Sequence, residues 1–254
     1  MHEDDYLRSI LAREAVNTGL LSPPRAAQFT LEPAIKRWAN NFLVSVSPSG
    51  SFAKGTANKS GTDIDLLISV SHTCPNNLES IYETLAQALT ENNYPIRRQN
   101  VSINVKVNGL DVDLVPAKRH DALSQDHSLW RRKAKTWTKT NVAKHIAHVT
   151  ASRRMNEIRI LKLWRSQQGL DFPSFYLELS VIEALSHGRA PGTLGRNVMT
   201  ALHYLRDRFP NARIIDPANT NNIISEDLTD SERATIQQAA KRAAAEPYWE
   251  GIVK

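Results

Sequence analysis

Residues 63–70 read DIDLLISV and residues 110–116 read LDVDLVP, and these two stretches decide the fold class. In both, aspartates alternate with apolar residues. Side chains alternate between the two faces of a β-strand, so each stretch predicts a strand with an acidic face and an apolar face. If the two strands are neighbours in one sheet, their carboxylates converge. Like charges about 4 Å apart repel by about 4 kcal/mol at intermediate dielectric, and bound Mg²⁺ is the usual remedy.

Four carboxylates belong to this pattern: Asp63, Asp65, Asp111 and Asp113. A single D-x-D pair is also typical of a solvated strand edge that has no ligand. Two pairs on alternating strands favour the interpretation as a metal site, although the pattern alone leaves both interpretations open.

The sequence around these strands predicts a mixed α/β part. Residues 43–47 alternate as a strand, and apolar positions over 77–91 follow the spacing of an amphipathic helix. Residues 101–114 predict a hairpin, because two alternating runs flank Asn108-Gly109, which favours a type I′ turn, and Pro116 is expected to stop the second run. Ahead of them, we expect a helix around residues 7–11 and a second helical stretch interrupted at Pro33.

The chain after about residue 118 is expected to be almost wholly helical. Apolar spacing predicts helices over 155–168, closed by Gly169, and over 175–185. Thr229 and Glu232 form the sequence of a capping box at the start of a last helix. The fold class is therefore α+β, with a small mixed sheet and a helical domain. We place an α/β domain, with the N-terminal helices, at residues 1–127 and a helical domain at residues 128–254.

Composition excludes several classes of protein. No stretch approaches the roughly 18 to 20 apolar residues that cross a bilayer, so no membrane partner is expected. The start of the chain is acidic where a secretory signal would be basic and then apolar, and the sequence holds one cysteine, Cys74. We therefore expect a cytoplasmic protein without disulfides and without a cysteine-built zinc site.

The positive charge of the chain is local. The net charge of the 254 residues is +6, whereas the 43 residues from Ser128 to Leu170 carry eleven basic residues and one acidic residue. The basic residues of this segment, 131–165, either form a solvated helix face or a track for nucleic acid, with Trp130 and Trp137 nearby. His145 and His148 lack a third ligand at metal spacing, so no metal is expected there.

A short glycine-bearing link precedes the first acidic pair. Residues 50–56 read GSFAKGT and lead from a strand into an expected helical turn. Glycine lets a backbone approach a phosphate closely, and backbone N–H groups there favour negative charge. Taken alone, the same residues are more typical of an ordinary tight turn.

Taken together, these motifs resemble the nucleotidyltransferase core of the DNA polymerase β-like superfamily. Gly50-Ser51, Asp63-Ile64-Asp65 and residues 110–116 match that family's order of G-S, D-x-D and a third acid about 50 residues later. Residues 158–164 with 174–179 are similar to the branch of oligoadenylate synthetases, bacterial cGAS/DncV-like enzymes (CD-NTases) and archaeal CCA-adding enzymes. Asp216-Pro217 with Asn221-Asn222 is similar to an element of the bacterial branch.

The resemblance implies a role for each matched residue. Asp63, Asp65 and Asp113 would be catalytic and hold two Mg²⁺ ions, or Mn²⁺, with Asp111 as a neighbour. The proposed nucleotide-binding residues are Gly50, Ser51, Lys162, Ser174 and Phe175. Lys162 and Ser174 would contact the phosphates and Phe175 would stack on the base, with Tyr176 as the fallback. From the sequence, Lys162 is equally typical of a surface lysine, and a core residue is the alternative interpretation of Phe175.

The resemblance implies transfer of NMP from an NTP substrate to a hydroxyl, without a template and with release of pyrophosphate. We expect an oligonucleotide or cyclic nucleotide signal as the product. Addition of nucleotides to RNA or tRNA 3′ ends is the alternative, with RNA as substrate or activator through the basic segment. A catalytically idle RNA- or nucleotide-binding module is a third possibility, which the three retained acids disfavour, because an idle module has no physical reason to keep mutually repelling carboxylates together.

Overall fold

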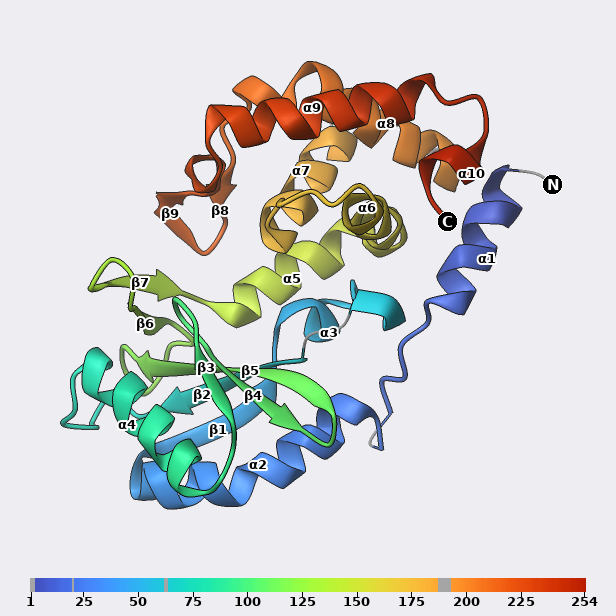
Figure 1. Cartoon of the computed structure of the whole chain (residues 1–254). Coiled ribbons are helices and arrows are strands. Elements are labelled where there is room, and N and C mark those ends of the chain that lie inside the picture. The colour runs from blue at the N-terminus through green and yellow to red at the C-terminus, as the bar shows by residue number, and fades with distance from the viewer. Residues whose placement is uncertain (1–2, 20, 62–63, 187–192) are drawn as a thin grey trace. The chain divides into compact units, whose positions relative to one another are not determined.

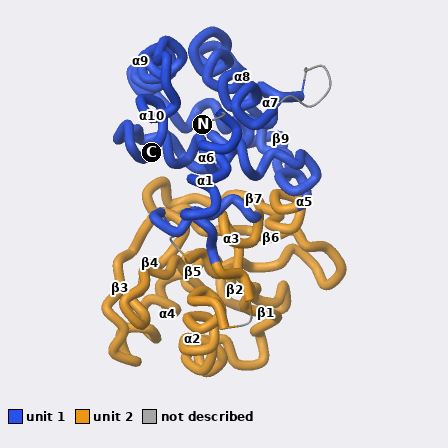
Figure 2. Tube along the Cα trace, turned by 90° about the vertical axis from the view of Figure 1, so that its right-hand side faces the viewer, with its two compact units in different colours: residues 1–16, 55–61, 147–254 blue, residues 17–54, 62–146 orange. Residues whose placement is uncertain are grey.

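The computed structural model of the protein describes residues 3–19, 21–61, 64–186 and 193–254 (Figure 1). The chain forms two compact units, coloured separately in Figure 2. Unit 1 comprises residues 1–16, 55–61 and 147–254, and unit 2 comprises residues 17–54 and 62–146. None of the described helices is both long enough and apolar enough to span a bilayer.

Unit 2 contains a seven-stranded mixed sheet and the helices around it. Its helices are α2 (Pro23–Ala39), α3 (Gly50–Lys54) and α4 (Leu78–Glu91). Its strands are β1 (Leu43–Pro48), β2 (Ile64–Val70), β3 (Ile96–Arg98), β4 (Ile103–Val107), β5 (Leu110–Arg119), β6 (His127–Arg131) and β7 (Thr136–Thr140). Five strands follow the order β1-β2-β5-β4-β3, and β6 pairs with β5 and β7. β2 and β5 run parallel, and the other neighbours run antiparallel.

One face of this sheet is apolar and is covered by α2 and α4 (Figure 1). Leu31 and Ile35 of α2 and Leu85 of α4 are buried there against Leu66 of β2 and Leu114 of β5. These strand residues alternate with the aspartates, which therefore lie on the opposite face. The predicted alternation of both acidic strands is confirmed.

The predicted hairpin and helix of this unit are also confirmed. Asn108 and Gly109 have φ of +51° and +79°, as a type I′ turn requires. α4 begins at Asn77, whose side chain accepts a hydrogen bond from the N–H of Ser80 at 2.8 Å.

Two expectations about proline are wrong. α2 runs through Pro33, which lies on the exposed side of the helix, where water can replace the missing hydrogen bond. β5 runs through Pro116 to Arg119. On that edge of β5, pairing with β4 ends at Leu114 and pairing with β6 begins at Ala117, so a residue without an N–H fits between them.

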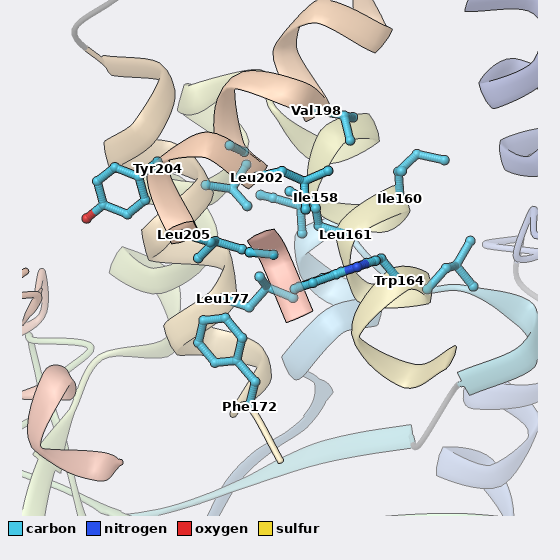
Figure 3. Packing of buried hydrophobic residues seen from close by; sticks show 14 of the residues in the cluster. Ile158, Ile160, Leu161, Trp164, Phe172, Leu177, Val198, Leu202, Tyr204 and Leu205 are labelled. Carbon is cyan, nitrogen blue, oxygen red and sulfur yellow. The ribbon is translucent and has the colours of Figure 1, made fainter. Parts of the chain in front are cut away.

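Unit 1 is mainly helical. Its helices are α1 (Glu3–Arg13), α6 (Met155–Gln167), α7 (Ser174–Ser186), α8 (Leu194–Asp207), α9 (Asp230–Ala245) and α10 (Trp249–Ile252). α5 (Val142–Ser152) begins in unit 2 and ends in unit 1. β8 (Ile215–Asp216) and β9 (Asn219–Ile223) form a small antiparallel pair. Figure 3 shows Trp164 of α6 pointing into the core among leucines of α7 and α8, and this residue is fully buried. The predicted capping box of Thr229 and Glu232 is present.

The two units differ from the predicted division at residue 127. The expectation of an almost wholly helical chain after about residue 118 is wrong at β6 and β7, which extend the sheet of unit 2. Trp130 and Trp137 are cross-strand partners in this hairpin, so their seven-residue spacing reflects a turn and not a helix. α1 belongs to unit 1, where its residues Leu7 and Ile10 join the helical core.

Candidate active site

Asp65 and Asp113 lie side by side on the polar face of the sheet. They are register partners on the adjacent parallel strands β2 and β5, and both side chains are half-buried. Neighbouring strands are about 4.8 Å apart, so two carboxylates on the same face at this register lie close together. The structure thus brings together two of the three predicted acids. Asp63 lies outside the described residues, and its place beside them stays a prediction.

Gly50 lies directly against Asp65. β1 leads through Ser49 into α3, and the N–H of Ser49 donates to the backbone carbonyl of Asp65 at 2.8 Å. Gly50 has φ of +56°, and a Cβ added there would lie 1.7 Å from Oδ2 of Asp65. Only a residue without a side chain therefore fits between the backbone of α3 and this carboxylate. Ser51 follows in the same helix, so the predicted Gly-Ser pair begins beside one of the predicted acids.

Three neutral side chains hold the carboxylate of Asp113, and the sequence analysis missed all of them. Nδ2 of Asn104 and Nε2 of Gln99 donate to Oδ1 at 2.8 and 3.1 Å, and the hydroxyl of Ser102 lies 3.5 Å from Oδ2. Asn104 is the register partner of Asp113 on β4. Its position was readable from the alternation over 103–107, which places Asn104 opposite the apolar residues and so on the face of the acids.

The donors at this site suit a hard divalent cation. Carboxylate oxygens are the ligands that Mg²⁺ prefers, and Mn²⁺ accepts the same set. Because the groups that orient Asp113 are uncharged, they fix its carboxylate without neutralising it. Within the described ranges, no group of three or more His, Cys, Asp or Glu side chains is placed to bind a metal, and Asp63 would be the third member here. The residues present therefore fit the predicted ion site.

Lys162 lies in unit 1 on α6 and is almost fully buried. Its ammonium forms an ion pair with Glu178 of α7 at 2.5 Å and donates to the hydroxyl of Thr56 at 3.0 Å. Thr56 also donates to Glu178, at 2.7 Å. The alternative of an exposed surface lysine is wrong, because the side chain is 8% exposed. Its contact with a triphosphate stays a prediction.

Ser174 and Phe175 begin α7 in the same unit. The hydroxyl of Ser174 accepts a hydrogen bond from the Arg165 guanidinium at 2.9 Å. Phe175 is half-buried and packs against the helical core, so part of its ring stays accessible. Tyr176 is fully buried with its ring against Phe172 and Phe209, at centroid distances of 5.3 and 5.1 Å. Tyr176 is therefore a core residue, and the fallback role in base stacking is wrong.

The basic segment is not one continuous helix face. Arg132, Lys133 and Lys135 are exposed at the tip of the β6–β7 hairpin in unit 2, beside Trp137, which is 56% exposed. The later members lie in unit 1, where Arg159 donates to the backbone carbonyls of residues 11, 14 and 57. Arg159 thus serves internal hydrogen bonding, whereas the exposed basic residues are those of the hairpin tip together with Lys144 and Arg153.

Comparison with known proteins places the chain among nucleotidyltransferases. No protein-family model matches it. A protein named cyclic AMP-AMP-AMP synthase from Escherichia coli (strain MS 115-1) is 26% identical over 235 residues, which cover 77% of this chain and 73% of that protein. The structure of E. coli MS115-1 CdnC with ATP has a TM-score of 0.77 at 22% identity and covers 98% of this chain and 96% of that chain. A structure of Cid1 poly(U) polymerase with Mg and 3′-dATP has a TM-score of 0.70 at 12% identity, over 100% and 99% of the chains.

These findings confirm the predicted resemblance. The relatives in sequence are CD-NTases, and the fold is that of the polymerase β-like nucleotidyltransferases. The predicted class of enzyme, a nucleotidyltransferase, is confirmed with it.

Proposed function

We propose that this chain, a nucleotidyltransferase related to the bacterial CD-NTases, joins nucleotides into a cyclic or linear oligonucleotide signal. The observation that supports this most directly is the pairing of Asp65 with Asp113 in register, with Gly50 against the first of them. The relative named cyclic AMP-AMP-AMP synthase supports the cyclic product.

The chemistry is attack of a ribose hydroxyl on the α-phosphate of an NTP. A bond forms between the hydroxyl oxygen and the α-phosphorus, the bond from the α-phosphorus to the bridging oxygen of the β-phosphate breaks, and pyrophosphate leaves. Asp113 lies on the side of the attacking hydroxyl and assists removal of its proton. Gly50 and Ser51 bind the phosphates of the donor NTP through the backbone of α3. Mg²⁺ or Mn²⁺ held by Asp63, Asp65 and Asp113 would supply charge stabilisation of the phosphates.

The family resemblance supplies the roles of three further residues in this proposal. Lys162 and Ser174 contact the triphosphate, and the accessible part of the Phe175 ring stacks on the base. For Lys162 to do so, its ammonium has to share its donors between the nucleotide and Glu178. In the structure the same ammonium also donates to Thr56, so contact with a nucleotide would share or replace one of these two hydrogen bonds.

Addition of nucleotides to RNA 3′ ends is the second candidate. The exposed tip of the β6–β7 hairpin favours it, because three basic side chains lie there beside an exposed tryptophan. Basic residues and a stacking aromatic side chain are typical of single-stranded nucleic acid binding. The similarity of fold to a poly(U) polymerase is compatible with the same activity.

One experiment separates these candidates. The protein is incubated with Mg²⁺ or Mn²⁺ and each labelled NTP, with and without tRNA, and the products are resolved by chromatography. Short or cyclic oligonucleotides formed without RNA support the proposed function, and lengthened RNA supports the second candidate. Absence of any product under all conditions contradicts both and supports an idle binding module.

A further inference from the structure

A row of polar side chains crosses the sheet of unit 2 on the face that carries the carboxylates. Register pairs connect its members one strand at a time. From the edge strand inward, the row consists of Arg97 on β3, Asn104 on β4, Asp113 on β5 and Asp65 on β2. Two members are the predicted metal ligands, and a third orients one of them.

Arg97 points to the acidic face because its neighbours face the other way. Ile96 packs against the core beneath the sheet, and Arg98 forms an ion pair with Glu83 of α4 at 3.1 Å. Since α4 covers the apolar face and side chains alternate along a strand, Arg97 lies on the opposite face. The three residues of β3 thus fix the orientation of the arginine.

The guanidinium of Arg97 is exposed and has no hydrogen bond or ion pair with any residue that the structure describes. Lys106, the next cation on this face, lies opposite Asp111 in register. Arg97 instead lies opposite the uncharged Asn104. Two strand spacings, about 10 Å, separate its backbone from that of Asp113, which leaves room for a phosphate between the arginine and the carboxylates.

The order of the row indicates which of the two nucleotides lies near Arg97. Gly50 and α3 lie at the Asp65 end, where the proposed function places the donor phosphates. In-line displacement requires the attacking hydroxyl on the opposite side of the α-phosphate from the leaving pyrophosphate. The nucleotide that carries this hydroxyl therefore lies beyond Asp113, over β4 and β3.

We propose that Arg97 binds the 5′-phosphate of the acceptor nucleotide, the one whose hydroxyl attacks. This inference rests on the proposed function and names the acceptor as a 5′-phosphorylated nucleotide. A guanidinium binds a phosphate through two parallel hydrogen bonds, which fix the orientation of the acceptor as well as its affinity. An acceptor without a 5′-phosphate gains nothing from this residue.

The test uses acceptors that cannot serve as donors. A nucleoside 5′-monophosphate has no pyrophosphate to lose, so with an NTP donor it reacts only through its hydroxyl, and the matching nucleoside lacks the 5′-phosphate. With the base that the chain uses fastest, Arg97→Ala is expected to raise the KM for the monophosphate about 10-fold or more. The KM for the nucleoside and the KM for the donor NTP are expected to stay unchanged.

Arg98→Ala is the matched control, because it removes the adjacent arginine from the opposite face and is expected to leave all three KM values unchanged. Arg97→Lys is expected to recover part of the affinity, since an ammonium keeps the charge but not the bidentate geometry. Unchanged values for Arg97→Ala, or an equal rise for the monophosphate and the nucleoside, would overturn the inference.

A binding measurement separates this inference from the proposed function. The 2′,3′-dideoxynucleoside 5′-monophosphate cannot react, and its Kd is expected to rise about 10-fold in Arg97→Ala whether or not the protein turns over. If the wild-type protein makes no product from any NTP, the proposed function fails. If the wild-type protein is active and Arg97→Ala has the same Kd for this monophosphate as the wild type, the inference about Arg97 is wrong and the proposed function stands.

Discussion

Gly50 lets the carboxylate of Asp65 lie against the backbone of α3. We predict that Gly50→Ala lowers NTP turnover about 100-fold, because the added Cβ would displace the carboxylate by about 1 Å or more. At a clash distance of 1.7 Å, either the carboxylate of Asp65 or the backbone of α3 has to shift. Turnover is measured as pyrophosphate release, and the far-ultraviolet circular dichroism spectrum checks that the variant is folded.

Gly109→Ala is the control for this substitution. Gly109 also has a positive φ, +79°, but an added Cβ there would meet nothing within 4 Å. The Gly109→Ala variant therefore has the backbone strain of an alanine at positive φ, about 1 kcal/mol, but no site residue is displaced. Turnover in Gly50→Ala at the level of Gly109→Ala would show that the position of Asp65 is unimportant for the reaction.

For single residues, the sequence predicted the carboxylates better than the side chains that form hydrogen bonds with them. Strand alternation has a period of two, so the acidic face of each strand followed from local pattern, whereas the pairing of β2 with β5 that brings Asp65 and Asp113 together did not. Ser102 lies in the alternating run that begins at Val101 and so shares the face of Asn104, whereas Gln99 lies before that run and could not be found in this way. Their contact with Asp113 depends on the path of the chain in three dimensions.

β6 is joined to the interior of the sheet through His127, which is buried and bonded to the hydroxyl of Ser69 at 2.8 Å. Burial lowers the pKa of His127 below the ordinary value of 6.5. As pH falls below about 6.5, the unfolded chain binds a proton at this residue that the folded chain does not. The contribution of His127 to the free energy of unfolding is therefore fully present above about pH 6.5. It is lost as the pH falls toward the lowered pKa of this residue.

We predict that the free energy of unfolding of the wild-type chain falls between pH 7.5 and pH 5.5 more steeply than that of His127→Gln. Glutamine does not titrate, so the variant lacks the contribution of this residue. The measurement is urea unfolding at both pH values. Equal pH slopes in the two proteins would contradict the assignment of His127 as a buried neutral histidine.

α6 and α7 are joined by the buried pair of Lys162 and Glu178. We predict that Glu178→Ala lowers the free energy of unfolding by about 3 to 5 kcal/mol, because it leaves an uncompensated buried ammonium. The double variant Lys162→Met, Glu178→Leu is expected to recover much of this loss, since apolar groups of similar volume need no partner. Both are measured by urea unfolding at pH 7.5.

Asp207→Ala is the matched control, because it removes an exposed ion pair with Arg206 in the same unit. Its expected cost is at most about 1 kcal/mol. A cost of Glu178→Ala no larger than that of Asp207→Ala would show that the Lys162 pair does not behave as a buried one.

Elements with a strong local period were predicted well, and elements that depend on distant partners were not. α4, α6 and the β4–β5 hairpin have apolar residues at regular spacing and clear ends. β6, β7 and the turn between them carry five basic residues and show little apolar alternation, and we expected this segment to be helical. Their strand structure follows from pairing with β5, which supplies the missing backbone partners.

For the whole molecule, the class of fold was predictable, but the path of the chain between the two units was not. The N-terminal helix α1 precedes all the strands of unit 2, and residues 55–61 lie between β1 and β2, yet both segments belong to unit 1. Arg159 stabilises this arrangement within unit 1 by donating to the carbonyls of Leu11 and Ala57. Such long-range contacts leave no periodic signal in a single sequence.

The central claim is that Asp113, together with Asp65, serves nucleotidyl transfer. Asp111 provides a matched control, because it lies two residues away on the same strand and face, exposed and opposite Lys106. The decisive measurement is pyrophosphate release from NTP by Asp113→Asn and by Asp111→Asn. We predict a loss of about 100-fold or more in Asp113→Asn, with the protein still folded, and nearly wild-type turnover in Asp111→Asn. Retained turnover in Asp113→Asn, or an equal loss in both variants, would contradict the claim.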